Sequence, residues 1–190
     1  MQNFIGQDLA LADFTGTNLT GAKFTCADLA GAKFTGANLI GADFTGANLS
    51  GAKFNATILT GANFVGADLT DAFLRTAKLT GANLVGAKLL RAILSFADLC
   101  EVKASASDMR DCRINGARMF EIFLVGADLR GASFLCSDLS GANLRGADVR
   151  GANFQDANLS NATFDGANLE GATLTNALTR GVDFRWSKVS

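Results

Sequence analysis

Large apolar residues recur at every fifth position of this chain, from Phe4 to Val189. Of these 38 centres, 36 are Phe, Leu, Ile, Val or Met, and the exceptions are Ala104 and Thr179. Two residues before the centre, 27 of the 38 positions hold Ala, and all 21 glycines lie two residues after a centre. The chain is therefore a tandem five-residue repeat without insertion or deletion, and this repeat dictates the fold.

Neither regular secondary structure explains a period of five. On a helix the centres would spiral around every face, and on a plain strand they would alternate between faces. The period fits a short extended piece followed by a corner, with the Ala and the centre pointing inward and the residue between them outward. Gly suits the corner because it tolerates positive φ. Stacked turns of this kind form an all-β solenoid, a β-helix.

The order of the centres indicates how many sides each coil has. Phe and Leu alternate strictly from Phe4 to Phe64. Four sides give a 20-residue coil in which rings stack on rings, whereas three sides would mix Phe and Leu in every stack. This regularity favours four sides and leaves three as the alternative. The predicted ring stacks are Phe4, Phe24, Phe44 and Phe64 on one side, and Phe14, Phe34 and Phe54 on the opposite side.

The units Ala27-Asp28-Leu29, Ala37-Asn38-Leu39 and Ala47-Asn48-Leu49 resemble the pentapeptide-repeat protein family, and the resemblance covers essentially the whole chain. It implies a right-handed quadrilateral β-helix of about nine coils of four pentapeptides each. The alanine-rich style is similar to cyanobacterial members, most of which have no assigned function. The family also includes DNA mimics that bind DNA gyrase and protect it from quinolones. The repeat pattern does not distinguish these roles.

Composition and charge limit the number of domains and the classes of partner that we expect for this chain. The chain has no Pro, no linker and no charge run, so we expect one domain over residues 1–190. No window approaches the ~20 apolar residues of a membrane span. The net charge of −1 is spread evenly, which argues against nucleic acid as a partner and against an acidic mimic. No signal peptide is expected, and whether a targeting segment was removed stays open.

The chain lacks the residue types that catalysis and metal binding need. It has no His and no Tyr, and a rod with a filled core has no pocket, so we expect no enzyme activity and no cofactor. The four cysteines form no CxxC pair, so no metal site is expected. We place Cys26 and Cys136 at corners, Cys100 outward and Cys112 inward. No pair is poised for a disulfide, which favours reduced thiols and a cytoplasmic location.

Residues 71–125 depart most from the repeat. Several corner glycines are replaced there, Val102 and Ile122 take Ala positions, and one centre shrinks to Ala104. One interpretation is compensation of core volume, because Val102 lies in the same unit as Ala104. The other is a local deformation that shapes a binding site.

The same region carries outward apolar residues, which form our candidate protein-interaction surface. Contiguous exposed apolar patches often mark contact sites. The alternative is that these residues lie on different sides and never form one patch. They are Phe73, Ile93, Phe96, Phe120 and Phe123.

A candidate charge ladder follows from the 20-residue register. One column holds Asp108, Asp128 and Asp148, and the column two residues further on holds Arg110, Arg130 and Arg150. Like charges at coil spacing repel, so each column needs the other to neutralise it. The ladder is then a self-compensating surface, with an anion-binding strip as the alternative.

The ends of the rod raise a further possibility. No helix that could cap the first or last coil is apparent, so the ends near Phe4 and Trp186 are candidates for self-association. Trp186 could instead cover the open end of the last coil. Three functional hypotheses follow: a structural or protein-interaction module with an unknown partner, a DNA mimic that binds gyrase, and a filament former.

Overall fold

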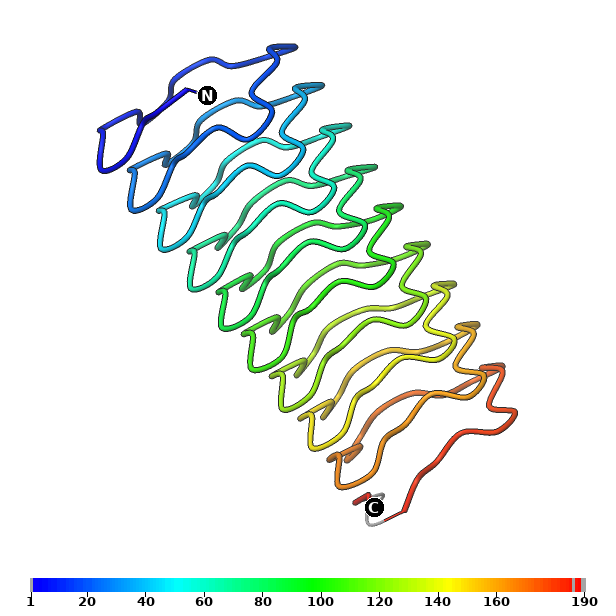
Figure 1. Ribbon diagram of the computed structural model, residues 1–190. Coiled ribbons are helices and arrows are strands. Elements are labelled where there is room, and N and C mark those ends of the chain that lie inside the picture. Colours follow the sequence, from blue (N-terminus) through cyan, green and yellow to red (C-terminus); the bar gives the residue numbers. More distant parts are fainter. Residues whose placement is uncertain (1, 186, 189–190) are drawn as a thin grey trace.

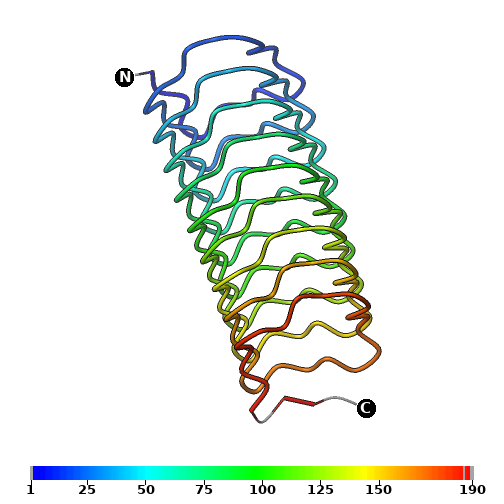
Figure 2. The same cartoon turned by 90° about the vertical axis from the view of Figure 1, so that its right-hand side faces the viewer.

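The computed structural model describes residues 2–185 and 187–188, which stack as the coils of an elongated solenoid. Successive turns lie above one another from the N-terminal to the C-terminal end (Figures 1 and 2). Parallel bridges join every fifth residue to the one 20 positions further along, from Asn3↔Lys23 to Asn168↔Lys188. The pairing register confirms four pentapeptides per coil and rules out the three-sided alternative.

The four sides are named here by their first centres. The first side begins with Phe4, the second with Leu9, the third with Phe14 and the fourth with Leu19. Each side contributes one bridging residue per coil, the residue directly before the centre, so the bridges run at five-residue intervals from 3 to 188. The described residues contain no helix and no strand longer than a single bridging residue.

Backbone hydrogen bonds hold each coil to the next. The amide of Phe4 donates to the Lys23 carbonyl at 2.8 Å, and the amide of Lys23 donates back to the Gln2 carbonyl at 3.0 Å. Within the coil, Gln7 N–H donates to the Phe4 carbonyl at 3.2 Å and closes the corner as a turn. The third residue of each turn has φ between 53° and 71° at every corner from Gly6 to Gly181. This conformation explains why glycine recurs at the corners.

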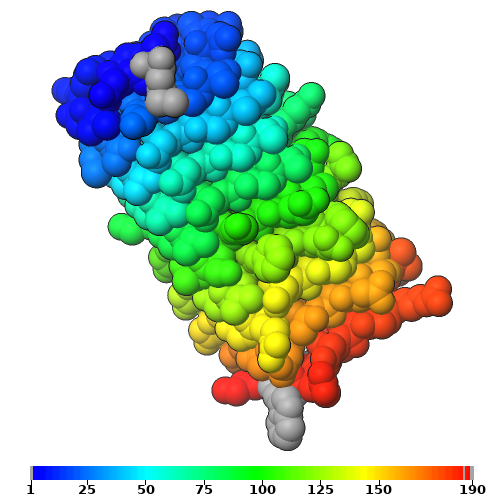
Figure 3. Space-filling view, in the orientation of Figure 1, coloured from blue at the N-terminus to red at the C-terminus, as the bar shows by residue number. Residues whose placement is uncertain are grey.

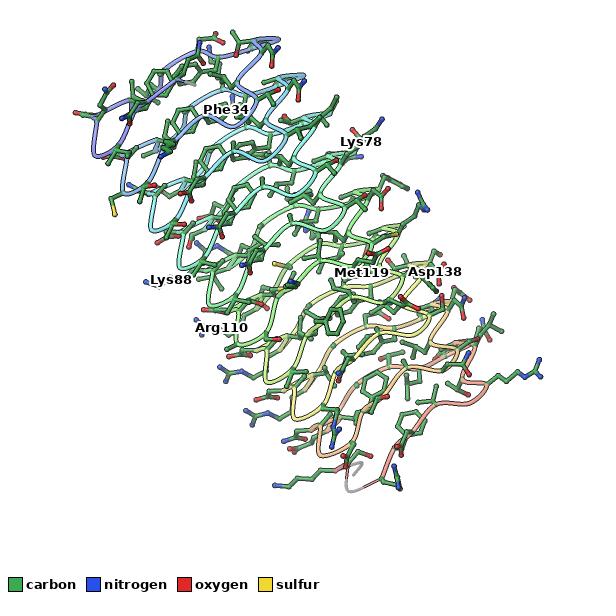
Figure 4. All side chains as sticks on the ribbon, viewed as in Figure 1. Phe34, Lys78, Lys88, Arg110, Met119 and Asp138 are labelled. Carbon is green, nitrogen blue, oxygen red and sulfur yellow. The ribbon has the colours of Figure 1, made fainter. Side chains whose placement is uncertain are left out.

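The core is a continuous column of small and large apolar side chains. Alanines and centres point inward together, and the side chains from Ala22 to Phe164 on these positions are almost entirely buried. Phe44 lies between Phe24 and Phe64, with ring centroids 4.9 Å away on both sides, and meets Phe54 edge-on at 5.9 Å. The predicted stacks of like rings are therefore present. Figure 4 shows Phe34 inside the coils, while Lys78 and Arg110 point outward.

A regularity at the bridging position was not anticipated from the sequence. Where this residue is Asn or Asp, its Oδ1 accepts the backbone N–H two residues later, as from Thr15 to Asp13 at 3.0 Å and from Thr70 to Asp68 at 2.9 Å. That amide lies within the turn and has no partner in the coil-to-coil ladder. The Asn or Asp side chain therefore stabilises each corner, which gives a physical reason for its frequency in the repeat.

The predicted outward position of Cys100 is more covered than expected. Only 8% of its surface is exposed, although the residue is not part of the apolar core. It is followed one coil later in the same column by Phe120, and burial, together with the nearby Asp98 carboxylate, raises the pKa of its thiol. Cys26 and Cys136 are exposed at corners and Cys112 is buried, as predicted.

Between residues 71 and 125 the altered inward positions keep their place in the core. Val102, Ala104 and Ile122 are all buried, and compensation of volume between them stays a prediction. The predicted lid residue, Trp186, lies outside the described residues. In residues 2–185 and 187–188 no helix has the length and apolar character needed to span a bilayer.

Candidate interaction surfaces

Phe73 and Ile93 occupy one column of the third side. They bridge each other directly, with Lys53 before them and Arg113 after them in the same column. Phe73 is 37% exposed, whereas Ile93 is half-buried. Both side chains thus face outward as predicted, although Ile93 offers less surface than expected. Apolar residues in this column have no side-chain oxygen that could accept the backbone N–H two residues later, as Asn or Asp would.

Phe96 stands at the corner between the third and fourth sides, with φ of +61° and 59% of its surface exposed. Its ring lies over Gly116, the corner one coil further on. The guanidinium of Arg75 lies over the same ring, 5.9 Å from its centroid, within the range of a cation–π interaction. The side chain is therefore held in place on the surface instead of projecting freely.

Phe120 and Phe123 lie further around the rod. Phe120, 44% exposed, ends a unit of the fourth side, and Phe123, 45% exposed, is a bridging residue of the first side. The corner at Glu121 separates them. The five candidates therefore do not share one side: Phe73, Ile93 and Phe96 form one group, and Phe120 and Phe123 wrap around the next corner.

The charge ladder is present on the second side with the predicted register, Asp108↔Asp128↔Asp148. Arg110 binds Asp108 of its own unit through two hydrogen bonds of 2.8 and 2.7 Å, and its Nε lies 3.7 Å from Asp128 of the next coil. Arg130 repeats this arrangement with Asp128 and Asp148. Figure 4 shows Arg110 projecting from this side. The geometry is that of a self-compensating surface.

The ion pairs of the ladder change the pKa of the three arginines and of two aspartates. Hydrogen bonds from Arg110 and Arg150 lower the pKa of Asp108 and of Asp148 respectively. The aspartates in turn raise the pKa of Arg110, Arg130 and Arg150. Since each guanidinium is already engaged by a carboxylate, an added anion would have to compete with that carboxylate. An anion-binding role for the ladder stays a prediction.

Sequence reasoning missed three cations on the third side. Lys53 and Arg113 flank Phe73 and Ile93 in one column, and Arg75 lies over Phe96. None of the three has a carboxylate within salt-bridge distance in the described part of the chain. A signal was available, because the bridging column of this side holds neither Asn nor Asp from Lys33 to Ser133.

The described part of the rod consists of convex sides and corners (Figure 3). Across residues 2–185 and 187–188 no pocket is found, and no group of three His, Cys, Asp or Glu side chains is placed to hold a metal ion. The space-filling view shows a closely filled outer surface on the face it presents (Figure 3).

Comparison with known proteins agrees with this architecture. The sequence profile described as pentapeptide repeats matches the chain in overlapping segments from residues 3–36 to residues 152–190. Among curated proteins, none matches the chain.

Solved structures give similar results. HetL of the cyanobacterium Nostoc sp. strain PCC 7120, a pentapeptide repeat protein involved in heterocyst differentiation regulation, is 30% identical over 97% of this chain and 89% of its own, with a TM-score of 0.43. A pentapeptide repeat protein from the thylakoid lumen of Arabidopsis thaliana is 37% identical over 52% of this chain and 69% of its own, with a TM-score of 0.52.

A third likeness concerns the fold alone. A trypsin-treated variant of QnrB1, a plasmid-mediated fluoroquinolone resistance protein, is 23% identical over 100% of this chain and 90% of its own, with a TM-score of 0.54. The family profile, in contrast, covers nearly the whole sequence, and the observed corners recur at the five-residue period of that family. The chain belongs to the pentapeptide-repeat family.

Proposed function

We propose that this protein is a non-enzymatic structural or protein-interaction module that presents a rod-like β-helical surface to a protein partner. The solenoid is taken to be a right-handed quadrilateral β-helix of about nine coils, as the family resemblance implies. Family membership and a filled core support this reading, since binding must then occur on exposed side chains. The proposal also places the protein in the cytoplasm. It assigns the protein no cofactor and neither nucleic acid nor a membrane as a partner.

The observation that carries the proposal is Phe96. A corner needs positive φ, which glycine adopts readily and which strains a large side chain. Phe96 nevertheless accepts φ of +61° and leaves 59% of its surface exposed, outside the core. Aromatic side chains are frequent hot spots of protein interfaces. The ring lies over Gly116 and near Arg75 on the surface, so core packing does not account for this residue, whereas a binding role does.

The gyrase-directed alternative is not favoured by the charges. A mimic of duplex DNA needs columns of negative charge, and here the longest aspartate column is neutralised by Arg110, Arg130 and Arg150. The net charge is only −1. The likeness to QnrB1 does not alter this, because at 23% identity it concerns the fold alone.

The test is affinity capture with in-cell cross-linking in the source organism. The bait is the whole chain, compared with a Phe96→Gly, Phe120→Thr double variant. We expect the double variant to fold with equal or greater stability and to lose the protein that the unaltered chain captures. A folded variant that retains every partner would place the contact elsewhere, and the absence of any specific partner would contradict the proposal.

A further inference from the structure

We propose that the third side carries a binding strip for an acidic, extended protein segment with a central apolar side chain. The strip consists of Lys53, Phe73, Arg75, Ile93, Phe96 and Arg113. This inference rests on the proposed function, because it names the chemistry of the partner that such a module would bind.

The first argument is the loss of a folding device at successive coils. On the third side the bridging position holds Lys33, Lys53, Phe73, Ile93, Arg113 and Ser133 in six consecutive coils. None of these is Asn or Asp, so none offers its own unit the carboxylate or amide oxygen that stabilises the corners elsewhere. In the Phe73 unit the turn amide of Arg75 donates instead to Asn55 Oδ1 of the preceding coil, at 3.1 Å. On the other three sides no such run exceeds two coils. Folding favours Asn or Asp here, so another requirement selects basic and apolar residues.

The second argument is charge. Lys53, Arg75 and Arg113 carry three positive charges with no carboxylate within 4.0 Å in the described residues. The cations nearby are different, because Lys33 binds Asp13 at 3.3 Å and Arg91 binds Asp71 at 2.6 Å. Unpaired cations around an apolar centre are complementary to a segment that carries carboxylates on both sides of an apolar residue.

The two aspartates at the corner before the third side do not neutralise the positive charge of the strip. Asp71 and Asp111 stand at the corner that precedes the third side, in units that lead to Phe73 and Arg113. Asp71 is already held by two hydrogen bonds from Arg91, of 2.8 and 2.6 Å. The carboxylate of Asp111 lies over Gly131, one coil further along its own corner. The strip itself therefore stays cationic.

The third argument is the arrangement of apolar surface between the cations. Phe73 and Ile93 lie between Lys53 and Arg113 in the bridged column, and Phe96 borders them with its ring beneath Arg75. From Lys53 to Arg113 there are three coil steps, about 14 Å at ~4.8 Å per step. Four residues of extended chain span about 13 Å. The strip therefore fits two acidic residues four positions apart, with an apolar side chain midway.

A nucleic acid is the less suitable occupant. Three unpaired cations would neutralise few phosphates, while nucleic-acid affinity depends on many such contacts. The charge ladder of the neighbouring second side is self-compensated, because Arg110, Arg130 and Arg150 pair with its aspartates, so it offers a long polyanion no surplus of positive charge. A short acidic segment needs only the three cations of the strip.

The test uses a fluorescein-labelled peptide, Gly-Glu-Ser-Phe-Ser-Glu-Gly, titrated with the whole chain at low salt and followed by fluorescence anisotropy. Control peptides carry Gln for both Glu residues or Ala for Phe, and an oligothymidylate serves as the nucleic-acid probe. We expect saturable binding of the first peptide, weakened by salt, and at least about tenfold weaker binding of both control peptides.

Matched protein variants locate the site. Lys53→Gln, Arg75→Gln, Arg113→Gln should weaken the peptide at least about tenfold. The control Lys23→Gln, Lys78→Gln, Lys103→Gln removes the same charge from the first and fourth sides and should leave binding within about twofold. Thermal melts verify that both variants fold, and Phe73→Thr provides a second, uncharged change to the strip that should also weaken binding.

Several outcomes would overturn the inference: no saturable peptide binding, an equal loss in the control variant, or tighter binding of the oligothymidylate. These are distinct from failure of the proposed function. A captured protein partner cross-linked to another side would refute the strip and leave the interaction role intact. The absence of any partner together with absent peptide binding would contradict both.

Discussion

The ring of Phe96 covers the α-carbon of Gly116, one coil further along the same corner. A β-carbon added at Gly116 would lie 2.7 Å from two carbons of that ring. Gly116 thus has two reasons to be glycine: its φ of +65° and the ring packed over it. The same relationship recurs where Leu11 precedes Gly31 by one coil. At both places a large apolar corner side chain leans toward the next coil, where the corner residue is glycine.

This contact predicts a measurable coupling. Gly116→Ala should destabilise the chain by more than the ~1–2 kcal/mol that positive φ alone costs an alanine, because the ring must also move. Phe96→Gly removes both the ring and the strain of its own φ, and should keep or raise stability. The double variant Phe96→Gly, Gly116→Ala should lose no more stability than the positive φ of the new alanine costs. Urea unfolding of the unaltered chain, the two single variants and the double variant should therefore show that the two substitutions together destabilise less than the sum of their separate effects.

The control is Gly86→Ala, at a corner with φ of +65° where an added β-carbon would meet nothing within 4 Å. It should show the φ cost alone, with or without Phe96. If Gly116→Ala and Gly86→Ala destabilise equally, the ring does not rest on Gly116 in solution.

The core makes a second prediction. Phe44 is fully buried between two stacked rings, so Phe44→Ala should cost about 3–5 kcal/mol through lost burial and a cavity. Phe73 is 37% exposed and outside the core, and Phe73→Ala should cost less than about 1 kcal/mol. Urea unfolding compares the two. Equal destabilisation would mean that the inward and outward positions are misassigned.

Much of the fold could be predicted because the repeat has no insertions. Once the centres are counted, the inward position of Phe44, the outward position of Phe73 and the stacking of rings follow from geometry. The same register correctly placed the aspartate and arginine columns side by side. A strict period carries positional information over the whole chain, which irregular folds lack.

What sequence reasoning missed depends on how side chains of adjacent coils lean. The period makes Cys100 an outward residue, yet it is buried, with Asp98 beside it and Phe120 one coil further on in the same column. The contact of Arg75 with Phe96 likewise links residues 21 positions apart and follows from rotamers, not from the repeat. The cations of the third side belong to different repeat units and come together only through the stacking of coils and the contact of Arg75 with Phe96.

The ends of the rod give a third prediction. In the first coil Phe4, Leu9 and Phe14 are only partly buried, and near the other end Leu174 and Phe184 are too. Open coil edges carry unpaired backbone groups that can pair with another chain. A chain of residues 1–190 should therefore show concentration-dependent dimers or longer stacks in analytical ultracentrifugation. Monomers alone at high concentration would show that the ends are closed by their own side chains.

A fourth prediction separates this protein from gyrase-directed members of the family. Its aspartate column is neutralised by arginines and its net charge is −1, so it should not occupy a surface built for duplex DNA. Purified gyrase should supercoil DNA at the same rate with and without the protein, and cells expressing it should gain no quinolone resistance. QnrB1 serves as the positive control for resistance. Protection at micromolar protein would revive the alternative.

The last prediction concerns acid stability. Hydrogen bonds from Arg110 and Arg150 lower the pKa of Asp108 and Asp148 below the ordinary value of 3.8. A carboxylate with a lower pKa in the folded than in the unfolded chain stabilises the fold above the unfolded pKa, and this contribution is lost as pH falls through the folded pKa. Stability should therefore decline below about pH 3.8. Urea midpoints measured between neutral and acidic pH follow this decline.

Variants at the ladder isolate its share of the acid sensitivity. In an Asp108→Asn, Asp148→Asn variant the amide oxygens can still accept the turn amides of Arg110 and Arg150, which lie 3.3 Å from the carboxylates, while the titrating charge is gone. The fall in midpoint on acidification should therefore be smaller than in the unaltered chain. The Arg110→Gln, Arg150→Gln variant should also show a smaller fall in the urea midpoint, because without their partners the aspartates return toward their ordinary pKa.

If both variants lose stability with acid as steeply as the unaltered chain, the ion pairs of the second side do not govern this response. Other carboxylates with a lowered pKa then become the next candidates, such as Asp43, whose partial burial is outweighed by its hydrogen bonds with Thr45 and Thr25.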